Sequence, residues 1–508
     1  MSFSKVYSAQ THLLSVTLIS VETDISKGLY SFSIVGLPDK AVEEARDRVV
    51  AAIKNSGFES PKSQNQKIIT SLAPAGVEKQ GTHFDVPIAL SFLLGNKDIE
   101  FDPEEKIFLG ELSLDGKIRP IRGALPIARF AKENKIKELY LPEENVAEGA
   151  LIEGVKVFGV KDLETLTSHL SGKQKVKPAP VTQLLNEAVI TPIDFADVRS
   201  QERAKRGLLI AAAGGHNVAM FGPPGTGKTM LAKAFAGILP QLTFEEALEA
   251  TGIHSVAGTL TETFITNPPF RSPHHTASYV SLVGGGANPK PGEVTLAHRG
   301  VLFMDEFPEF ERRVIESLRQ PLEDKVIAIA RAKGTAIFPA NVLLVASMNP
   351  CPCGNYGFKG PRCICTPSSL QRYRRKMSGP IMDRIDIWVE VDRILPRELG
   401  STGRVGEESK NFRKKVERAR AVQQKRFKDR PTIKNGEMTT KDLVTLVFLE
   451  KDAEKTLNLA AERLGFSPRV YHRMIKVART IADLEGSDVI KANHILEAVE
   501  YRPKKFDV

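Results

Sequence analysis

The eight residues GPPGTGKT, at positions 222–229, restrict the fold of this chain more than any other feature of its sequence. They follow an apolar run, NVAMF at 217–221, that is predicted to be a strand, and they precede an apolar stretch, MLAKAFAGIL, that is predicted to be a helix. Glycines at this spacing allow a tight loop whose N–H groups point at phosphate oxygens at the start of the helix. The order of strand, loop and helix predicts an α/β domain that binds a nucleotide.

The loop residues have separate expected roles. Lys228 would reach the β and γ phosphates of ATP, and the Thr229 hydroxyl would bind Mg²⁺. The other residues expected to surround the phosphates are Gly222, Pro223, Pro224, Gly225, Thr226 and Gly227.

Two further strands are predicted to end in polar residues. GVLFMDE ends in Asp305, expected to coordinate Mg²⁺, and in Glu306, expected to polarise the attacking water. NVLLVASMN ends in Asn349, which could contact the γ-phosphate or that water. Arg384 ends a predicted helix just before a strand. It could reach the nucleotide of a neighbouring subunit or form an ordinary ion pair, and the residues leave both open.

The length of 508 residues predicts two or three domains at about 150 residues each. We expect an α/β domain at 1–170, a linker at 171–192, a nucleotide-binding domain at 193–395 and a helical domain at 396–508. The first thirty residues lack the apolar core of a signal peptide, and no stretch reaches the ~18 apolar residues that span a bilayer. We therefore expect a cytoplasmic protein with no membrane partner.

The net charge of +10 is concentrated in one segment. Between Lys410 and Lys434 there are eleven basic and two acidic residues. Such a run is most often a solvated helix face, but it is also what binding to a phosphate backbone requires. We expect the helix to bury an apolar stripe and to leave its Lys and Arg side chains on the open faces. The stripe consists of Phe412, Val416, Ala419 and Val422.

All four cysteines lie within fifteen residues, which indicates a local site rather than a secreted disulfide framework. They are Cys351, Cys353, Cys363 and Cys365. Four thiolates can complete a tetrahedral Zn²⁺ shell, but C-x-C spacing is less common than C-x₂₋₄-C. Zinc binding, reduced structural thiols and a redox switch remain open.

Several stretches resemble the ComM/YifB family of magnesium chelatase-like AAA+ ATPases, in the clade that includes the MCM helicases. They include PFRSPHHTAS, LVGGGANPKPGEVTLAHRGVLFMDE and NPCPCGNYG. SFSIVGLPDKAVEEARDRV and EKQGTHFDVPIAL resemble the Lon-protease-like (S5 domain 2-like) α/β domain of that family, and SPRVYHRMIKVARTIADLEG resembles its helical lid domain. The resemblance implies an N-terminal Lon-like α/β domain, an AAA+ P-loop α/β core and a C-terminal helical lid.

The resemblance also implies a homo-oligomeric ring, expected to be a hexamer, with ATP at the subunit boundaries. Arg384 matches the arginine finger, Arg469 matches the sensor 2 arginine, and Gln201 lies in the segment that packs near the adenine. Members of this family are DNA helicases associated with branch migration during natural transformation. The resemblance therefore implies single-stranded or branched DNA, and recombination proteins, as partners.

Two insertions are candidates for contact with DNA. KVIAIARAKGTAIFPA at 325–340 is predicted to be a hairpin with Arg331 and Lys333 near its tip, which the resemblance would place in the pore of the ring. The alternative is an ordinary surface hairpin. GGGANPKPG at 284–292 is expected to be a mobile loop with Lys290 as its only charge. His274 and His275 receive no role, because adjacent histidines without placed acids or cysteines are usually structural or surface residues.

Lon-type proteases use a Ser-Lys pair, and the corresponding position here falls near His83, where no nucleophile stands. Thr82 has no visible base beside it. We therefore expect the fold of this domain without protease activity, which disfavours an ATP-dependent protease. The main alternative to a DNA motor is a chelatase-type ATPase that remodels a partner protein.

Overall fold

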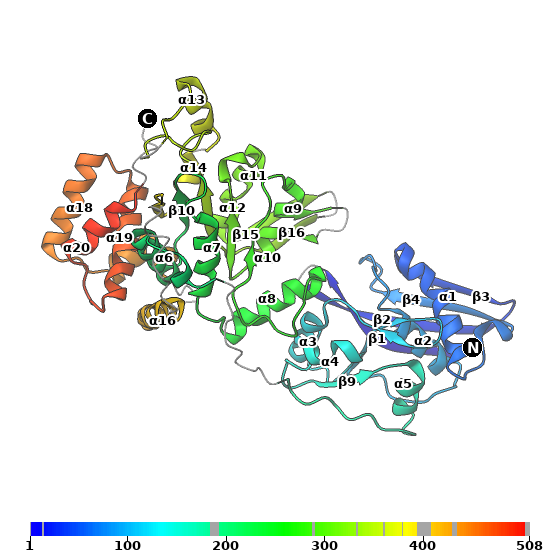
Figure 1. The fold of residues 1–508 in the computed structure, drawn as a ribbon. Coiled ribbons are helices and arrows are strands. Elements are labelled where there is room, and N and C mark those ends of the chain that lie inside the picture. Colours follow the sequence, from blue (N-terminus) through cyan, green and yellow to red (C-terminus); the bar gives the residue numbers. More distant parts are fainter. Residues whose placement is uncertain are drawn as a thin grey trace. The chain divides into compact units, whose positions relative to one another are not determined.

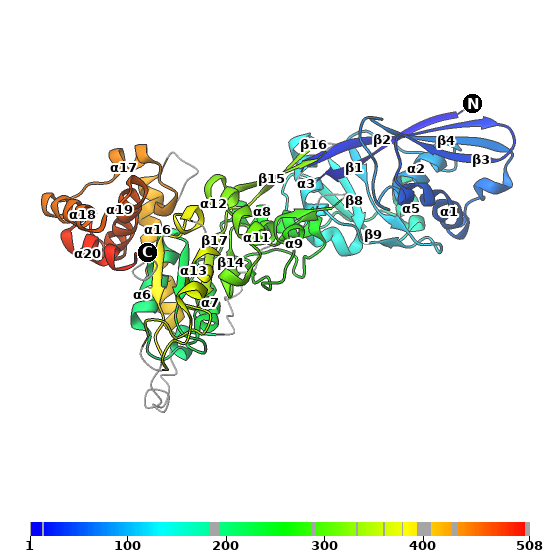
Figure 2. The same cartoon turned by 90° about the horizontal axis from the view of Figure 1, so that it is seen from above.

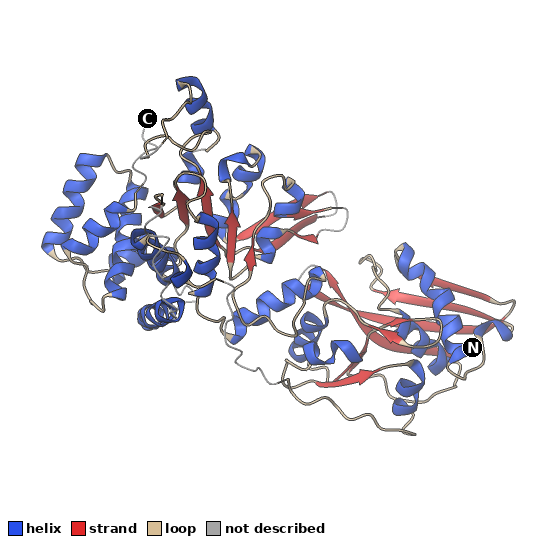
Figure 3. Cartoon of the chain, in the orientation of Figure 1, coloured by secondary structure: helices blue, strands red, loops and turns tan. Residues whose placement is uncertain are grey.

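The computed structural model describes residues 2–12, 15–182, 193–286, 290–331, 334–358, 361–377, 379–393, 408–428 and 434–502. The chain divides into two compact units (Figure 1). Unit 1 comprises Met1–Asn186 and Thr251–Ile265, and unit 2 comprises Glu187–Ala250 and Thr266–Val508. Both units mix helices and strands (Figure 3), so the predicted α/β class is confirmed.

Unit 1 is built around a four-stranded sheet in the order β1-β2-β4-β3. Its strands are β1 (Ser2–His12), β2 (Ser15–Lys27), β3 (Ser31–Val35) and β4 (Gln66–Ala73). Strand β3 runs parallel to β4, and helix α1 (Lys40–Asn55) connects them. Asp39 begins this helix by accepting a hydrogen bond from the Val42 N–H at 2.9 Å. Helix α2 (Asp85–Gly95) is buried along almost its whole length against β1, β2 and α1, which makes it the centre of the unit 1 core.

The rest of unit 1 is a second, parallel sheet with the order β5-β8-β9 and a short hairpin. These strands are β5 (Lys106–Phe108), β8 (Glu138–Pro142) and β9 (Lys156–Val160), and the helices are α3 (Ala124–Glu133), α4 (Val146–Gly149) and α5 (Leu163–Leu170). The predicted hairpin is confirmed, since β6 (Glu111–Leu112) and β7 (Ile118–Arg119) pair antiparallel. Its turn contains Gly116 at φ 86°, a conformation that favours glycine.

The segment expected to be a linker begins as part of unit 1. The N–H of Ala179 donates to Val157 O at 2.8 Å, and the N–H of Thr182 donates to Ala150 O at 3.0 Å. Residues 183–192 lie outside the described residues.

Unit 2 contains a parallel five-stranded sheet in the order β11-β14-β17-β10-β18. Its strands are β10 (Val218–Phe221), β11 (Phe270–Arg271), β14 (Val301–Met304), β17 (Leu343–Met348) and β18 (Ile387–Glu390). Alternate residues of β10 lie in two different hydrophobic cores. Val218 and Met220 belong to one core, and Ala219 and Phe221 belong to the other. Both faces of the sheet are therefore covered, which explains why its strands are continuous apolar runs in the sequence.

Helices and short strands surround this sheet. The helices of unit 2 up to β18 are α6 (Glu202–Gly214), α7 (Lys228–Gly237), α9 (Tyr279–Val283), α10 (Glu293–Leu296), α11 (Arg312–Ser317), α12 (Arg319–Asp324), α13 (Pro367–Arg375) and α14 (Gly379–Met382). Helix α8 (Phe244–Ala257) begins in unit 2, and its residues from Thr251 onward belong to unit 1. The short strands are β12 (Gly284–Gly285), β13 (Lys290–Pro291), β15 (Val326–Arg331) and β16 (Gly334–Pro339). None of the helices in the described part of the chain is both long and apolar enough to cross a bilayer.

The C-terminal part of unit 2 is helical, as predicted, and it packs on α6 through α16 and α19 (Figure 2). Its helices are α16 (Glu408–Arg426), α17 (Thr440–Leu446), α18 (Lys451–Leu464), α19 (Pro468–Leu484) and α20 (Ala492–Glu500). Val416 of α16 and Met474 of α19 lie in one core with Leu208 of α6 and Val218 of β10. The helical domain and one face of the sheet thus share a single hydrophobic core.

The predicted orientation of α16 was wrong in two respects. Val422, placed in the apolar stripe, is 41% exposed, and Gln423 is buried instead. Arg413 and Arg420, expected on the open faces, donate to the carbonyl groups of Gly237 and Ala212. These carbonyls lie in the last turns of α7 and α6, where no intrahelical N–H is available to them. The two guanidinium groups therefore cap helix ends, and fewer charges remain for a ligand.

Candidate active site

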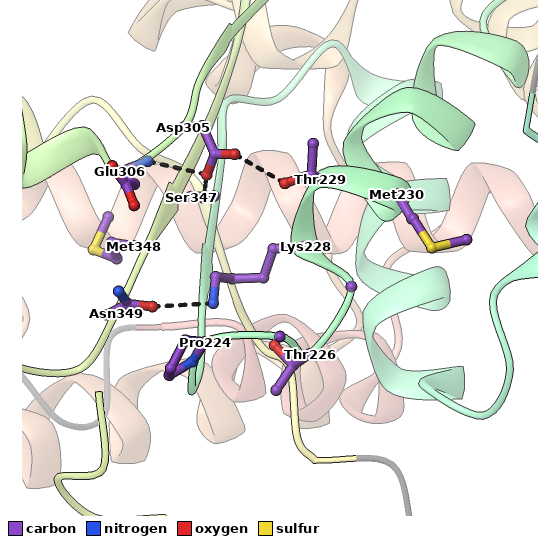
Figure 4. A pocket seen from close by; sticks show the side chains of 12 residues that line it. Pro224, Thr226, Lys228, Thr229, Met230, Asp305, Glu306, Ser347, Met348 and Asn349 are labelled. Atoms are coloured by element: carbon purple, nitrogen blue, oxygen red, sulfur yellow. Dashed lines mark hydrogen bonds between the residues drawn. The ribbon is translucent and has the colours of Figure 1, made fainter. Parts of the chain in front are cut away.

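Three neighbouring parallel strands end at the same edge of the unit 2 sheet, and each is followed by residues of the predicted site. The phosphate-binding loop follows β10, Asp305 and Glu306 follow β14, and Asn349 follows β17. Their side chains surround a cavity of about 400 Å³ (Figure 4). It is lined by Pro224, Gly225, Thr226, Gly227, Lys228, Thr229, Met230, Asp305, Glu306, Ser347, Met348 and Asn349.

The backbone of the loop has the conformation that its glycines allow. Gly225 and Gly227 have φ values of 75° and 87°, in the left-handed region, and Gly227 directly precedes helix α7. A Cβ at Gly222 would lie 2.0 Å from the carbonyl oxygen of Val391, so this position requires glycine because of close packing. The glycines at 225 and 227 carry no side chain beside the N–H groups at the start of α7, which suits the binding of phosphate oxygens.

Lys228 extends across the floor of the cavity (Figure 4). Its Nζ donates to the carbonyl oxygens of Gly222 and Pro223 at 2.8 Å each and to Asn349 Oδ1 at 3.3 Å. Burial lowers the pKa of Lys228 to about 8, although the carboxylates of Asp305 and Glu306 act in the opposite direction. A polyanion in the cavity would raise this pKa again, because it stabilises the charged amine.

Asp305 is held beside the Thr229 hydroxyl. Thr229 Oγ1 donates to Asp305 Oδ2 at 2.8 Å, the Glu306 N–H donates to Asp305 Oδ1 at 3.0 Å, and the Ser347 hydroxyl donates to the same Oδ1. One carboxylate and one hydroxyl next to a phosphate-binding loop are the oxygen ligands that Mg²⁺ prefers. The residues therefore fit the predicted metal. Ser347 was not predicted from the sequence, although its position near the end of β17 could have indicated it.

Glu306 has a left-handed backbone, with φ 52°, which is uncommon for a residue with a side chain. Its carboxylate lies 3.3 Å from His275 Nδ1, and both side chains are partly exposed. Sequence reasoning assigned no role to His275. The missed signal is positional, because His275 follows β11, which ends at the same edge of the sheet.

Arg384 and Arg469 do not line this cavity. Both bind the same carboxylate, Glu323 of α12: Arg384 Nη2 donates to Oε2, and Arg469 Nη2 donates to Oε1 at 3.2 Å. The hydrogen bond from Arg384 is the main reason that the pKa of Glu323 is lowered. The Arg384 side chain is 10% exposed and that of Arg469 is 59% exposed. The structure thus brings these two arginines together, at Glu323 and outside their own chain's pocket.

Gln201 also lies outside the cavity. It directly precedes α6, and its Nε2 donates to the carbonyl oxygen of Asp392 at 2.7 Å. The segment on which the adenine prediction rests is therefore tied to the backbone that follows β18.

The predicted hairpin at 325–340 is confirmed, since β15 and β16 pair antiparallel from Val326 opposite Pro339 to Arg331 opposite Gly334. Arg331 is the last paired residue of β15, whereas Lys333 lies outside the described residues. Lys290 is exposed in β13, which forms a two-residue ladder with β12.

In unit 1, the segment expected to correspond to a protease site is closed. Lys79 is fully buried, and its Nζ donates to Pro74 O. The Thr82 hydroxyl donates to the Glu111 carboxylate. His83 is buried, which lowers its pKa to about 4. Lys79 and His83 are thus held in the interior of unit 1. Thr82 is paired with the carboxylate of Glu111 and not with the amine of Lys79, which a Ser-Lys type of site would require.

The four cysteines are free thiols that lie close together in unit 2. Their Sγ atoms are all within 4.8 Å of one another. We call residues 351–365 the cysteine loop; within it, 359–360 lie outside the described residues. Cys351 is buried and the other three are partly exposed.

Three family models match separate stretches of the chain. The family model for "Magnesium chelatase, subunit ChlI" matches residues 194–399, the model for "Subunit ChlI of Mg-chelatase" matches 21–145, and the model for "Magnesium chelatase, subunit ChlI C-terminal" matches 406–502. Lon protease 2 of Bacillus subtilis is 30% identical over 167 residues, which cover 31% of this chain and 30% of that protease.

Several relatives match almost the whole chain. Competence protein ComM of Haemophilus influenzae is 40% identical over 512 residues, which cover 99% of this chain and 98% of ComM. The protein YifB of Escherichia coli is 40% identical over 504 residues, which cover 99% of this chain and 97% of YifB. The chain therefore belongs to the ComM/YifB family of magnesium chelatase-like AAA+ ATPases.

Proposed function

We propose that this chain hydrolyses ATP in the unit 2 cavity. The observation that supports this most directly is the convergence of Lys228, Thr229, Asp305, Glu306 and Asn349 on one space of about 400 Å³. The loop N–H groups and Lys228 would bind the β and γ phosphates. Thr229 and Asp305 would hold Mg²⁺, which when bound neutralises charge on the phosphates.

Glu306 and Asn349 would act on the other reactant. The Glu306 carboxylate would orient the attacking water and accept its proton, and the Asn349 amide, already hydrogen-bonded to Lys228, would contact the γ-phosphate. His275 would hold Glu306 until the water is in place, since its Nδ1 contacts the carboxylate oxygen Oε2.

We propose further that hydrolysis requires a second copy of the chain. Among the described residues that line the pocket, Lys228 is the only one with an amine or a guanidinium group. Arg384 and Arg469 both bind Glu323 elsewhere in unit 2. Two arginines held on one carboxylate could enter a neighbour's pocket together and stabilise transition-state charge. A homo-oligomeric ring, most simply a hexamer, would supply every pocket in this way.

The cargo that we propose is DNA, and the activity is that of a helicase that promotes branch migration during natural transformation or recombination. The name of the Haemophilus relative, a competence protein, supports this assignment. The net charge of +10 and the exposed Lys414, Arg418 and Lys425 on α16 suit a phosphate backbone. The hairpin that carries Arg331 and Lys333 would add a contact within the ring.

A chelatase-type ATPase that remodels a partner protein is the second candidate, because all three family models carry magnesium chelatase descriptions. The closed Lys79–His83 segment gives no such support to proteolysis.

The rate of ATP hydrolysis with and without single-stranded, duplex and four-way-junction DNA distinguishes the two. A DNA motor should be stimulated by at least one of these DNAs, and the stimulation should shrink steeply as salt rises, because phosphate contacts release counterions. Hydrolysis that no DNA changes at any salt concentration would favour remodelling of a protein partner and would contradict the proposed cargo.

A further inference from the structure

The cysteine loop has the geometry of a metal site. Cys351 Sγ lies 3.4 Å from Cys353 Sγ and 3.8 Å from Cys363 Sγ, and the last two are 3.6 Å apart. A tetrahedral zinc ion with Zn–S bonds of about 2.3 Å separates its sulfur ligands by about 3.8 Å. The sulfur atoms of a disulfide are about 2 Å apart, so the observed distances correspond to a shared ligand shell rather than to oxidised pairs.

The backbone around the cluster supports the same interpretation. The Tyr356 N–H donates to Cys351 Sγ at 3.3 Å, which is a contact that stabilises a thiolate. The chain turns at Gly354, between Cys353 and Tyr356. Gly354 has a φ of 78°, and its N–H donates to Cys351 O at 2.9 Å. The first Cys-x-Cys pair therefore lies on a tight turn that presents its sulfurs to one point.

This turn contacts the phosphate-binding loop. Gly354 packs so closely against Pro224 that a Cβ would lie 2.4 Å from the proline Cδ. Phe358 lies edge-on to Phe221, the last residue of β10 before the loop, with ring centroids 6.2 Å apart. The cysteine loop therefore packs directly against Pro224, which lines the nucleotide cavity.

The second Cys-x-Cys pair leads into α13, which returns to Asn349. Thr366, next to Cys365, precedes this helix and accepts from the Ser369 N–H at 3.3 Å. Tyr373 of α13 donates its hydroxyl to the carbonyl oxygen of Asn349 at 2.9 Å. Asn349 itself lies two residues before Cys351. The first Cys-x-Cys pair is therefore linked to Asn349 through the chain, and the second pair is linked to it through α13 and Tyr373.

The cysteine loop also borders a small cavity beside the Glu306 carboxylate, through Cys351 and Pro352. This cavity of about 170 Å³ is lined by Glu306, Glu309, Asn349, Cys351, Pro352 and Tyr373. The loop is thus a wall of the space next to Glu306 as well as a neighbour of the phosphate-binding loop.

We propose that Cys351, Cys353, Cys363 and Cys365 bind one Zn²⁺ as thiolates, and that this ion fixes Asn349 and the phosphate-binding loop in position for hydrolysis. Binding forms four Zn–S bonds and releases the protons of those thiols that were protonated. The ion contacts no substrate and leaves no open position for one, so its role is structural. The second half of the proposal rests on the proposed ATPase function; the first half does not.

The metal is tested on the full-length chain by elemental analysis. We expect one zinc per chain, and we expect the Cys363→Ser/Cys365→Ser variant to retain none after gel filtration. Ser368→Ala, which changes an exposed residue of α13 just after the cysteine loop, is the matched control and should keep the ion. Replacing zinc with Co²⁺ should give the absorption of a tetrahedral cobalt thiolate in the unmodified chain, which avoids any dependence on how the variant folds. A chain that binds neither ion after reduction and reconstitution overturns the metal site.

The positioning role is tested by removing zinc from the unmodified chain with a chelator, and separately with the variant. Turnover should fall at least about ten-fold, as it does when supports of a site are removed, while a fluorescent ATP analogue still binds. Re-addition of zinc should restore turnover to the unmodified chain only. Full turnover in a zinc-free chain overturns the positioning role and leaves the metal site intact. A chain that holds zinc but never hydrolyses ATP instead contradicts the proposed function, not the metal site.

Discussion

Lys228 gives the most quantitative prediction, because its amine is partly neutral before a nucleotide arrives. Burial lowers its pKa to about 8, whereas phosphates in the cavity would favour the charged form. ATP binding should therefore be accompanied by proton uptake at any pH at which Lys228 of the free chain is partly deprotonated. The pKa is lowered in the free chain, so affinity should be greatest below about pH 8 and should fall as the pH rises through that value.

The size of the effect follows from the pKa. If only the charged lysine binds ATP, the dissociation constant scales with one plus the ratio of neutral to charged amine. With a pKa of about 8, this factor grows about eight-fold between about pH 7.5 and about pH 9. The same pKa predicts an uptake of about half a proton per ATP bound at about pH 8 and about 0.9 at about pH 9.

Isothermal titration calorimetry in buffers of different ionisation enthalpy measures this uptake directly. Glu306→Gln allows the measurement without hydrolysis. Adding Lys228→Arg supplies the matched control, because a guanidinium stays charged throughout this range and its proton uptake should disappear. An affinity that stays flat from pH 7.5 to 9 with no proton uptake in the Lys228 protein would refute the reasoning.

Other predictions concern catalysis, the subunit boundary and α16. Glu306→Gln should bind ATP but hydrolyse it at least about 100-fold more slowly, because general base catalysis is lost; normal turnover would overturn its role. Arg384→Ala should bind ATP without hydrolysing it, and mixing it with Lys228→Ala subunits should partly restore turnover; no rescue at any ratio would contradict action between subunits. Arg420→Ala should lower the free energy of unfolding by about 2 kcal/mol, since the Ala212 carbonyl loses its charged donor. Lys414→Ala, which changes an exposed residue of the same helix, should leave stability unchanged and reduce the salt dependence of DNA binding by about one unit of slope; the reverse pattern would mean that Arg420 serves DNA.

Much of the unit 2 site was predictable because short stretches of sequence determine its local structure. A glycine loop between an apolar strand and a helix specifies one conformation, and polar residues after parallel strands must meet at one edge of the sheet. This is why Lys228, Asp305, Glu306 and Asn349 were found from the sequence alone and lie together in the structure.

What could not be predicted depends on contacts between distant segments. The stripe on α16 was misjudged at Val422 because periodicity does not reveal that two neighbouring helices end beneath Arg413 and Arg420. Glu323 carries no motif at all, and its contact with Arg384 joins residues 61 positions apart. His275 was passed over because its partner, Glu306, follows a different strand.

The central claim is that ATP hydrolysis in this pocket moves DNA. Its most direct test is branch migration of a synthetic four-way junction by the purified chain with ATP and Mg²⁺, beside Glu306→Gln. The account predicts strand products that appear with ATP, do not appear with a non-hydrolysable analogue, and are absent with the variant at equal DNA binding. A chain that hydrolyses ATP and binds the junction yet never converts it to products would contradict the claim.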